Sequence, residues 1–262
     1  MRNEAPDPFE ISIKAWRELP ELMQALPVAF IAVVLVMIPL EYLRILTGFD
    51  GFALPHPKEA AEISLFYTFA KCLLGTPFVI AIYRRILLGE QKRTWLTVAA
   101  MRRTLWFFIC IFLAILAPEI WLPVAILARG GVLPGELYYW ATIVGMNLGF
   151  VFYVTTLFLF PAIAVDSTGA KWRAAIHDAV VTWAVTGPAL LLTILPGVLL
   201  DPLKAALIDP MASRTTRLGM AIVNSIETNL LAAAIAVMAC YLYRFHADRS
   251  RGAAVGDAAQ AG

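Results

Sequence analysis

The stretch Leu218–Tyr243, LGMAIVNSIETNLLAAAIAVMACYLY, is a run of 26 mostly apolar residues between Arg217 and Arg244. At ~1.5 Å per residue, a helix of this length reaches ~39 Å, which is enough to cross a ~30 Å hydrocarbon core with some tilt. Glu227, ten positions after Arg217, does not suit lipid. A carboxylate at that depth is costly unless it has a partner. The stretch therefore predicts a membrane span whose Glu227 faces protein or water.

The composition supports a membrane protein throughout. Of 262 residues, 60% are hydrophobic and 15% are charged, whereas soluble domains carry ~45–50% apolar and ~25% charged residues. The net charge of +2 gives no reason to expect a nucleic-acid partner. The three cysteines, Cys72, Cys110 and Cys240, lie in apolar runs without metal or disulfide spacing. We therefore expect the lipid bilayer as the main partner, and neither a metal nor another cofactor.

The hydrophobic runs predict an all-helical membrane domain over residues 27–246. Residues 9–26 repeat apolar side chains every three or four positions around Trp16, which predicts an amphipathic surface helix within residues 1–26. Pro20 is expected to bend or interrupt that helix. Residues 247–262 are predicted to form a disordered tail. The six predicted spans lie at about 27–46, 63–83, 104–128, 137–165, 179–200 and 218–243.

The positions of lysine and arginine predict the orientation. Six spans place both termini on one side, and that side collects fourteen of these residues against six on the other. Because basic residues are retained in the cytoplasm, we expect both termini on the cytoplasmic side of a bacterial inner membrane.

Three tryptophans suggest an internal repeat. Trp16, Trp95 and Trp172 lie 79 and 77 residues apart, and each precedes an odd-numbered span. The chain then reads as three units, each with a surface helix, an outward span and a returning span. A coincidence of layout is the alternative. Repeats of this kind often place a binding site between units near the middle of the membrane, which is an argument by analogy.

The repeat aligns a layer of polar side chains at similar depth. Lys71, Asn147 and Glu227 lie on the returning spans, whereas Glu41 and Glu119 lie on the outward ones. Asn224, Glu227 and Thr228 share one face of the last span because they are three and four residues apart. We hypothesise that this face meets Lys71 and forms a Lys71–Glu227 ion pair. The candidate ligand-binding residues are Glu227, Lys71, Asn147, Glu119, Asn224 and Glu41.

Each candidate also has a simpler interpretation. A Lys–Glu pair within the membrane is equally compatible with a lock between helices. Asn147 lies between Gly145 and Gly149, a pattern that favours close helix packing. Glu41 and Arg44 are three residues apart and can pair with each other alone.

Catalytic patterns are absent from the sequence. It contains no HExxH, no P-loop and no GxSxG elbow, so we predict no catalytic residues. A metal-free membrane enzyme that uses Glu119, Glu227 or Glu41 is the third alternative.

A basic belt surrounds the second cytoplasmic surface segment. It suits anionic lipid headgroups, and its simpler interpretation is that it sets the topology alone. The belt consists of Arg84, Arg85, Lys92, Arg93, Arg102 and Arg103.

The segment FLFPAIAVDSTGAKWRAAIHDAV, residues 158–180, carries a family resemblance. An apolar span that ends in proline, an acidic residue and an Ala-rich amphipathic helix resembles the membrane domain of some glycerophosphodiester phosphodiesterases. It is also similar to stand-alone six-helix bacterial inner-membrane proteins related to that domain. The resemblance implies six helices and cytoplasmic termini, and it implies no activity because the catalytic domain of those enzymes is a separate soluble unit.

These observations give two main expectations for function. The first is the binding or transport of a small molecule or lipid through the polar layer. The second is a non-transporting scaffold or assembly factor with a structural Lys–Glu pair. The sequence leaves a homo-oligomer open.

Overall fold

The computed structural model describes residues 7–46, 57–90, 98–119, 135–165, 172–207 and 213–260. Within these residues the chain is helical and has no strand, which confirms the predicted all-helical class for them. The helices are α1 Pro8–Ala25, α2 Pro27–Leu46, α3 Pro57–Leu88, α4 Val98–Glu119, α6 Gly135–Ala164, α7 Trp172–Leu207 and α8 Arg214–Gln260.

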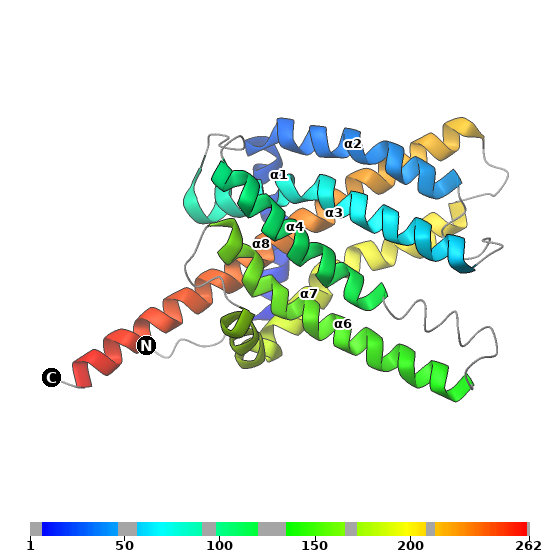
Figure 1. Ribbon diagram of the computed structural model, residues 1–262. Helices are drawn as coiled ribbons and strands as arrows, with labels where there is room; N and C mark the ends of the chain where they lie inside the picture. The colour runs from blue at the N-terminus through cyan, green and yellow to red at the C-terminus, as the bar shows by residue number, and fades with distance from the viewer. Residues whose placement is uncertain are drawn as a thin grey trace.

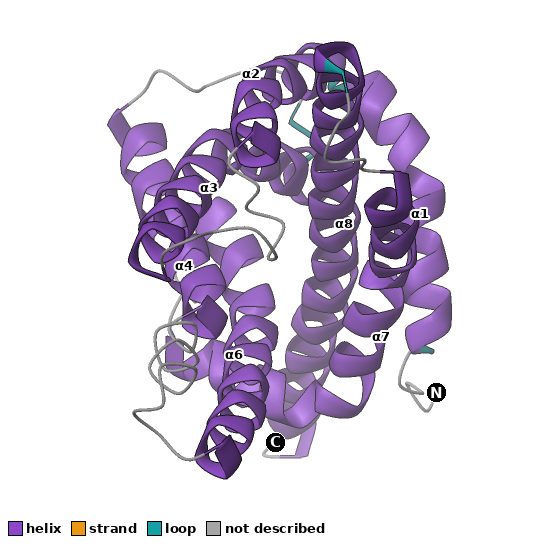
Figure 2. Ribbon diagram, turned by 90° about the vertical axis from the view of Figure 1, so that its right-hand side faces the viewer, coloured by secondary structure: helices purple, strands orange, loops and turns teal. Residues whose placement is uncertain are grey.

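Helix α8 occupies the centre of the assembly (Figure 2) and contacts α1, α2, α3, α6 and α7. Small side chains explain how so many helices approach it. Ala233, Ala234 and Ala239 are fully buried, as are their neighbours Val237 and Met238. Because alanine adds little bulk, neighbouring backbones can pack closely against this part of the helix. The stretch that predicted a membrane span is thus the core element of the fold.

The helices α2, α3, α4, α6, α7 and α8 run in alternating directions (Figure 1). The ends of α2, α4 and α7 therefore lie at the same end of the bundle as the starts of α3, α6 and α8. The last turns of α8 project from the opposite end. Helix α1 differs, because it runs across the bundle near that second end instead of along it.

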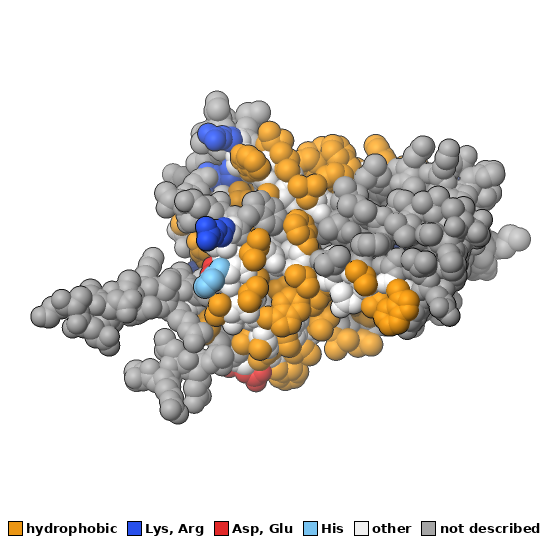
Figure 3. All heavy atoms as spheres, turned by 60° about the horizontal axis from the view of Figure 1, so that its bottom comes forward, with side chains coloured by type: hydrophobic (Ala, Val, Ile, Leu, Met, Phe, Trp, Pro, Cys, Tyr) orange, Lys and Arg blue, Asp and Glu red, His pale blue; other side chains and the backbone are white. Residues whose placement is uncertain are grey.

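Four helices among the described residues are long and apolar enough to cross a membrane. These segments are Pro27–Leu46, Phe66–Leu88, Arg173–Leu200 and Arg214–Phe245, and α6 contains the shorter apolar segment Gly149–Ala164. Figure 3 shows hydrophobic side chains across the middle of one face, with Lys, Arg and His side chains at its left margin. This arrangement is consistent with a membrane protein.

Several helix boundaries differ from those predicted. The surface segment after Trp172 and the fifth span form one continuous helix, α7, which extends to Leu207 into the predicted loop. Helix α8 starts at Arg214, where Ser213 Oγ accepts a hydrogen bond from Thr216 N at 3.2 Å. It continues to Gln260, across the residues predicted to form a disordered tail.

Helix α1 is continuous through Pro20, so Pro20 does not interrupt it, and the alternative of a bend stays a prediction. One proline removes a single intrahelical hydrogen bond, and the first turn is secured by Asp7, whose side chain accepts from Phe9 N at 3.0 Å. The predicted third span ends in residues 120–128, which lie outside the described residues, as does Trp95 of the predicted repeat.

Helix α1 is packed against the bundle by one apolar face. Ile11, Ala15, Leu19 and Leu22 are buried, and the helix contacts α7 and α8. Between α1 and α8, the Tyr241 hydroxyl of α8 donates a hydrogen bond to the Glu18 carboxylate of α1. The helix that the sequence predicts to lie in the headgroup layer is therefore also part of the protein core.

Two backbone carbonyls, one in α7 and one in α2, accept hydrogen bonds from side chains of other helices. Near Pro196, the Trp16 indole Nε1 donates to Thr193 O at 3.1 Å. Near Pro39, Ser225 Oγ donates to Val34 O at 2.8 Å. Each contact connects two helices, α1 to α7 and α8 to α2.

Replacing Trp16 by Phe should reduce the free energy of unfolding, because the Thr193 carbonyl loses its indole donor while most of the ring packing remains. We expect a loss of about 0.5–1.5 kcal/mol, measured by SDS titration in mixed micelles. Trp106→Phe is the matched control, since Trp106 is 53% exposed, and it should change stability by less than about 0.5 kcal/mol. Equal effects of the two substitutions would contradict a role for the indole hydrogen bond.

Candidate functional site

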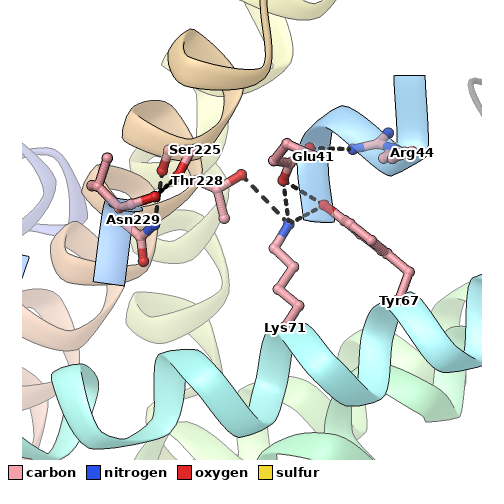
Figure 4. A network of polar contacts seen from close by, with 8 residues as sticks. Glu41, Arg44, Tyr67, Lys71, Ser225, Thr228 and Asn229 are labelled. Carbon is pink, nitrogen blue, oxygen red and sulfur yellow. Dashed lines mark hydrogen bonds and ion pairs between the residues drawn. The ribbon is translucent and has the colours of Figure 1, made fainter. Parts of the chain in front are cut away.

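A buried carboxylate lies where α2, α3 and α8 meet. Glu41 of α2 is 1% exposed, and Figure 4 shows its side chain between Arg44 on one side and Tyr67 and Lys71 on the other. The Tyr67 hydroxyl donates to Glu41 Oε1. Arg44 Nη1 lies 3.6 Å from Glu41 Oε2. A desolvated carboxylate needs such donors and cations, because its charge is otherwise very unfavourable.

Lys71 connects this carboxylate to the central helix. Its Nζ lies 3.9 Å from Glu41 Oε1 and donates to the Tyr67 hydroxyl at 3.4 Å. It also donates to Thr228 Oγ1 of α8 at 3.4 Å. One ammonium group thus has polar contacts on three helices. We call Glu41, Arg44, Tyr67, Lys71 and Thr228 the Glu41 cluster.

Aromatic contacts hold the two cations in place. Arg44 and Lys71 both lie over the Tyr67 ring, at 5.4 Å and 5.3 Å from its centroid. A cation within about 6 Å of an aromatic face is attracted by the ring quadrupole. Tyr67 therefore orients both cations by its ring while its hydroxyl binds the carboxylate.

The turn of α8 beside the cluster is rich in polar side chains. Ser225 binds the Val34 carbonyl of α2, and Asn229 Nδ2 donates to Ser225 O at 2.7 Å. Asn224 Oδ1 is buried and, among the described residues, accepts no hydrogen bond. Buried amide oxygens normally have a donor. This turn therefore presents a buried acceptor one helical turn before Thr228.

Glu227 is on the neighbouring face of α8. A β-carbon placed on Gly197 of α7 would lie 3.7 Å from Glu227 Oε1 and 3.3 Å from Leu231 Cδ2. The missing side chain at Gly197 therefore gives this carboxylate its space beside α7. The prediction that the Asn224–Thr228 face of α8 meets Lys71 is confirmed through Thr228. Lys71 forms an ion pair with Glu41, and the Lys71–Glu227 pair stays a prediction.

The remaining candidates have different surroundings. Asn147 is exposed on α6, and its Nδ2 donates to Ile143 O of its own helix at 2.7 Å. Glu119 is the last residue of α4, and its side chain lies outside the described residues. The interpretation that Glu41 and Arg44 pair with each other is confirmed, although the pair is part of a larger cluster.

The basic belt contains one arginine with a clear structural role. Arg84 Nε donates to Glu90 Oε2 at 2.6 Å, and its Nη1 donates to Ala164 O at 2.9 Å. Gly89, with a φ of +67°, forms the turn that brings Glu90 back to Arg84. Arg84 thus ties the end of α3 to the end of α6. Arg102 is exposed, Arg85 and Arg103 are half-buried, and Lys92 and Arg93 lie outside the described residues.

Tyr67 and Ser225 were not predicted as site residues. Tyr67 is four residues before Lys71, so the two share a face of α3. This spacing could have identified Tyr67 as a neighbour of Lys71 from the sequence. Ser225 gave no comparable signal, because its partner is a backbone carbonyl 191 residues away.

The Glu41 cluster can hold an acidic group of a ligand. It combines a fixed carboxylate with two cations and a phenol, and guanidinium and ammonium groups are the usual partners of carboxylates and phosphates. Within the described residues, no group of three or more His, Cys, Asp or Glu side chains is placed to hold a metal ion. A comparison with protein-family models, curated proteins and solved structures finds no match for this chain.

A double-mutant cycle with Glu41→Gln and Lys71→Met should show strong coupling in the free energy of unfolding. We expect an interaction energy of about 0.5–3 kcal/mol, because each substitution removes part of the same contact. The parallel cycle with Lys71→Met and Glu227→Gln measures the Lys71–Glu227 pair. We expect it to give the smaller value, since the Glu227 carboxylate approaches Gly197. A larger coupling in the second cycle would favour the Glu227 pair.

Proposed function

We propose that this chain is a six-span protein of a bacterial inner membrane that binds or transports a small molecule or lipid at the Glu41 cluster. The proposed ligand carries an acidic group, and it enters from the end of the bundle where α2 ends and α3 begins.

The helix lengths and directions support six spans. In addition to the four segments named above, α4 has 22 residues and α6 has 30, which correspond to ~33 Å and ~45 Å of helix. Both lengths suffice to cross a hydrocarbon core of ~30 Å. The alternating directions in Figure 1 are those expected for consecutive crossings. An even number of crossings returns the chain to its starting side.

The distribution of basic residues supports cytoplasmic termini. Arg84 and Arg85 lie near the end of α3, and Arg102 and Arg103 near the start of α4. These helix ends are at the same end of the bundle as the last turns of α8. Since arginine and lysine are enriched on the cytoplasmic side, this end faces the cytoplasm and the Glu41 cluster lies toward the outside.

The exposure of the cations is the observation that carries the proposed ligand site. Glu41 is only 1% exposed, whereas the side chains of Arg44 and Lys71 remain 32% and 30% exposed. Glu41 is five residues before the end of α2, or ~7.5 Å along the helix. The carboxylate thus contacts both cations from inside the bundle, and part of each cationic side chain remains accessible at the bundle surface. Ionisable groups held within membrane helices commonly mark ligand or ion pathways.

A structural lock is the competing function. The complete burial of Glu41 and the contacts of Lys71 on three helices favour it, since such contacts would also fix a scaffold. The two functions differ in whether water reaches Lys71 and Thr228. The resemblance to the phosphodiesterase membrane domain is compatible with both, and it supports the architecture alone.

Cysteine labelling separates the two functions. Single cysteines at Asn224, Thr228 and Leu231 should react with a charged, membrane-impermeant maleimide added outside cells, because the proposed site is open to water on that side. Val223→Cys is the matched control on the same helix. Val223 is exposed on the bundle surface, where lipid should exclude the charged reagent. The unmodified chain supplies the background, since Cys72, Cys110 and Cys240 are buried.

Reaction at Thr228→Cys together with protection at Val223→Cys would support the ligand site. No reaction at any of the three test positions would instead favour the dry lock. Lys71→Met should change the reactivity at position 228 several-fold under the first proposal, since the Lys71 ammonium directly faces Thr228.

The proposed orientation has its own test. A cysteine that replaces Ser250, near the end of α8, should react with the same reagent only after the membrane is permeabilised. Reaction in intact cells would reverse the topology and would place the Glu41 cluster toward the cytoplasm.

A further inference from the structure

Helix α6 exposes a polar side chain in the middle of an apolar stripe. Trp140, Val144, Asn147 and Val151 are all exposed. They are separated by four, three and four residues, so they lie on one face of the helix. Gly149 is buried, and its position, two residues after Asn147, places it on the opposite face. The stripe therefore points away from the bundle.

Asn147 lies near the centre of α6. It is twelve residues after Gly135 and seventeen before Ala164, or ~18 Å and ~25 Å from the two helix ends. Its Nδ2 donates one hydrogen bond, to Ile143 O. A primary amide has two donor hydrogens and an acceptor oxygen, so this contact uses only part of its capacity. In the hydrocarbon core, polar groups left without partners are costly.

We propose that a second copy of this chain covers the stripe and that Asn147 pairs with Asn147 of that copy. All copies enter the membrane in the same orientation, so a twofold dimer has its axis along the membrane normal and brings α6 against α6 in parallel. In such a dimer the same patch meets itself. An amide suits this arrangement because each Asn147 can donate to the other and also accept from it.

The side chains around Asn147 favour a second copy over a different partner. Val144 and Val151 lie on either side of Asn147 along the stripe, and both are small enough to let two helices approach. The described part of the stripe carries no charged residue that would select an oppositely charged partner. A different protein would need its own polar group at the same depth, whereas symmetry supplies one automatically. The inference rests on the proposed membrane insertion and not on the ligand site.

Disulfide crosslinking in native membranes tests the dimer. Single cysteines at Val144, Asn147 and Val151 should each form a covalent dimer with a membrane-permeant oxidant. Leu35 of α2 and Leu191 of α7 are the control positions, since both are exposed and lie on other helices. Cysteines there should give little dimer. Equal crosslinking at all five positions, or none on α6, would overturn the proposal, as would a crosslink on α6 to another protein.

The role of the amide needs a separate variant. Asn147→Leu should weaken the dimer about 3- to 30-fold, measured by subunit counting in vesicles at decreasing protein density. Asn147→Gln should retain more of the dimer, because it keeps the donor and the acceptor. In detergent, at concentrations where the protein is monomeric, the thermal unfolding temperature should be similar in both variants, since among the described residues the hydrogen bond of Asn147 is to its own helix. An unchanged dimer in Asn147→Leu would overturn the role of Asn147. Labelling at Thr228→Cys gives an independent readout of the ligand site.

Discussion

The burial of one carboxylate determines how α2, α3 and α8 fit together. Glu41 is almost completely removed from solvent, so its charge must be balanced by groups from its surroundings. Arg44 comes from its own helix, Tyr67 and Lys71 come from α3, and Lys71 continues the network to Thr228 on α8. If any of these helices moved by a few ångströms, a charge would lose its partners. The polar cluster therefore fixes the relative positions of helices whose apolar surfaces alone would tolerate sliding.

Polar contacts also connect helices elsewhere in the bundle. Side chains of other helices donate hydrogen bonds to the Thr193 carbonyl of α7 and the Val34 carbonyl of α2. Ser225 and Trp16 provide these contacts, while the small side chains of α8 allow its neighbours to come within reach. In a nonpolar medium water cannot replace missing partners. The polar contacts between the described helices therefore connect specific elements.

Much of the fold could be predicted because local sequence properties decide it. Length and hydrophobicity identified the helices, and the run around Ala233 proved to be the central helix. The confirmed contact of α8 with Lys71 followed from helical spacing and similar depth. The carboxylate that binds Lys71 was harder to identify. Glu41 and Glu227 were both expected at the depth of Lys71, and the structure places the Glu227 carboxylate beside Gly197 of α7. A glycine on a third helix gives no signal of that kind in a linear reading.

The sequence by itself determined that the chain forms long apolar helices with a few charged residues inside them, because hydrophobicity and helical periodicity are local properties. It also showed that Glu41 and Arg44 can pair, since three residues on one helix bring them together. Only the tertiary structure decided that Tyr67, Lys71 and Thr228 join this pair, that α1 packs on α7 and α8, and that Asn147 faces outward. These outcomes depend on the rotation and offset of whole helices, which arise from packing between residues far apart in the chain.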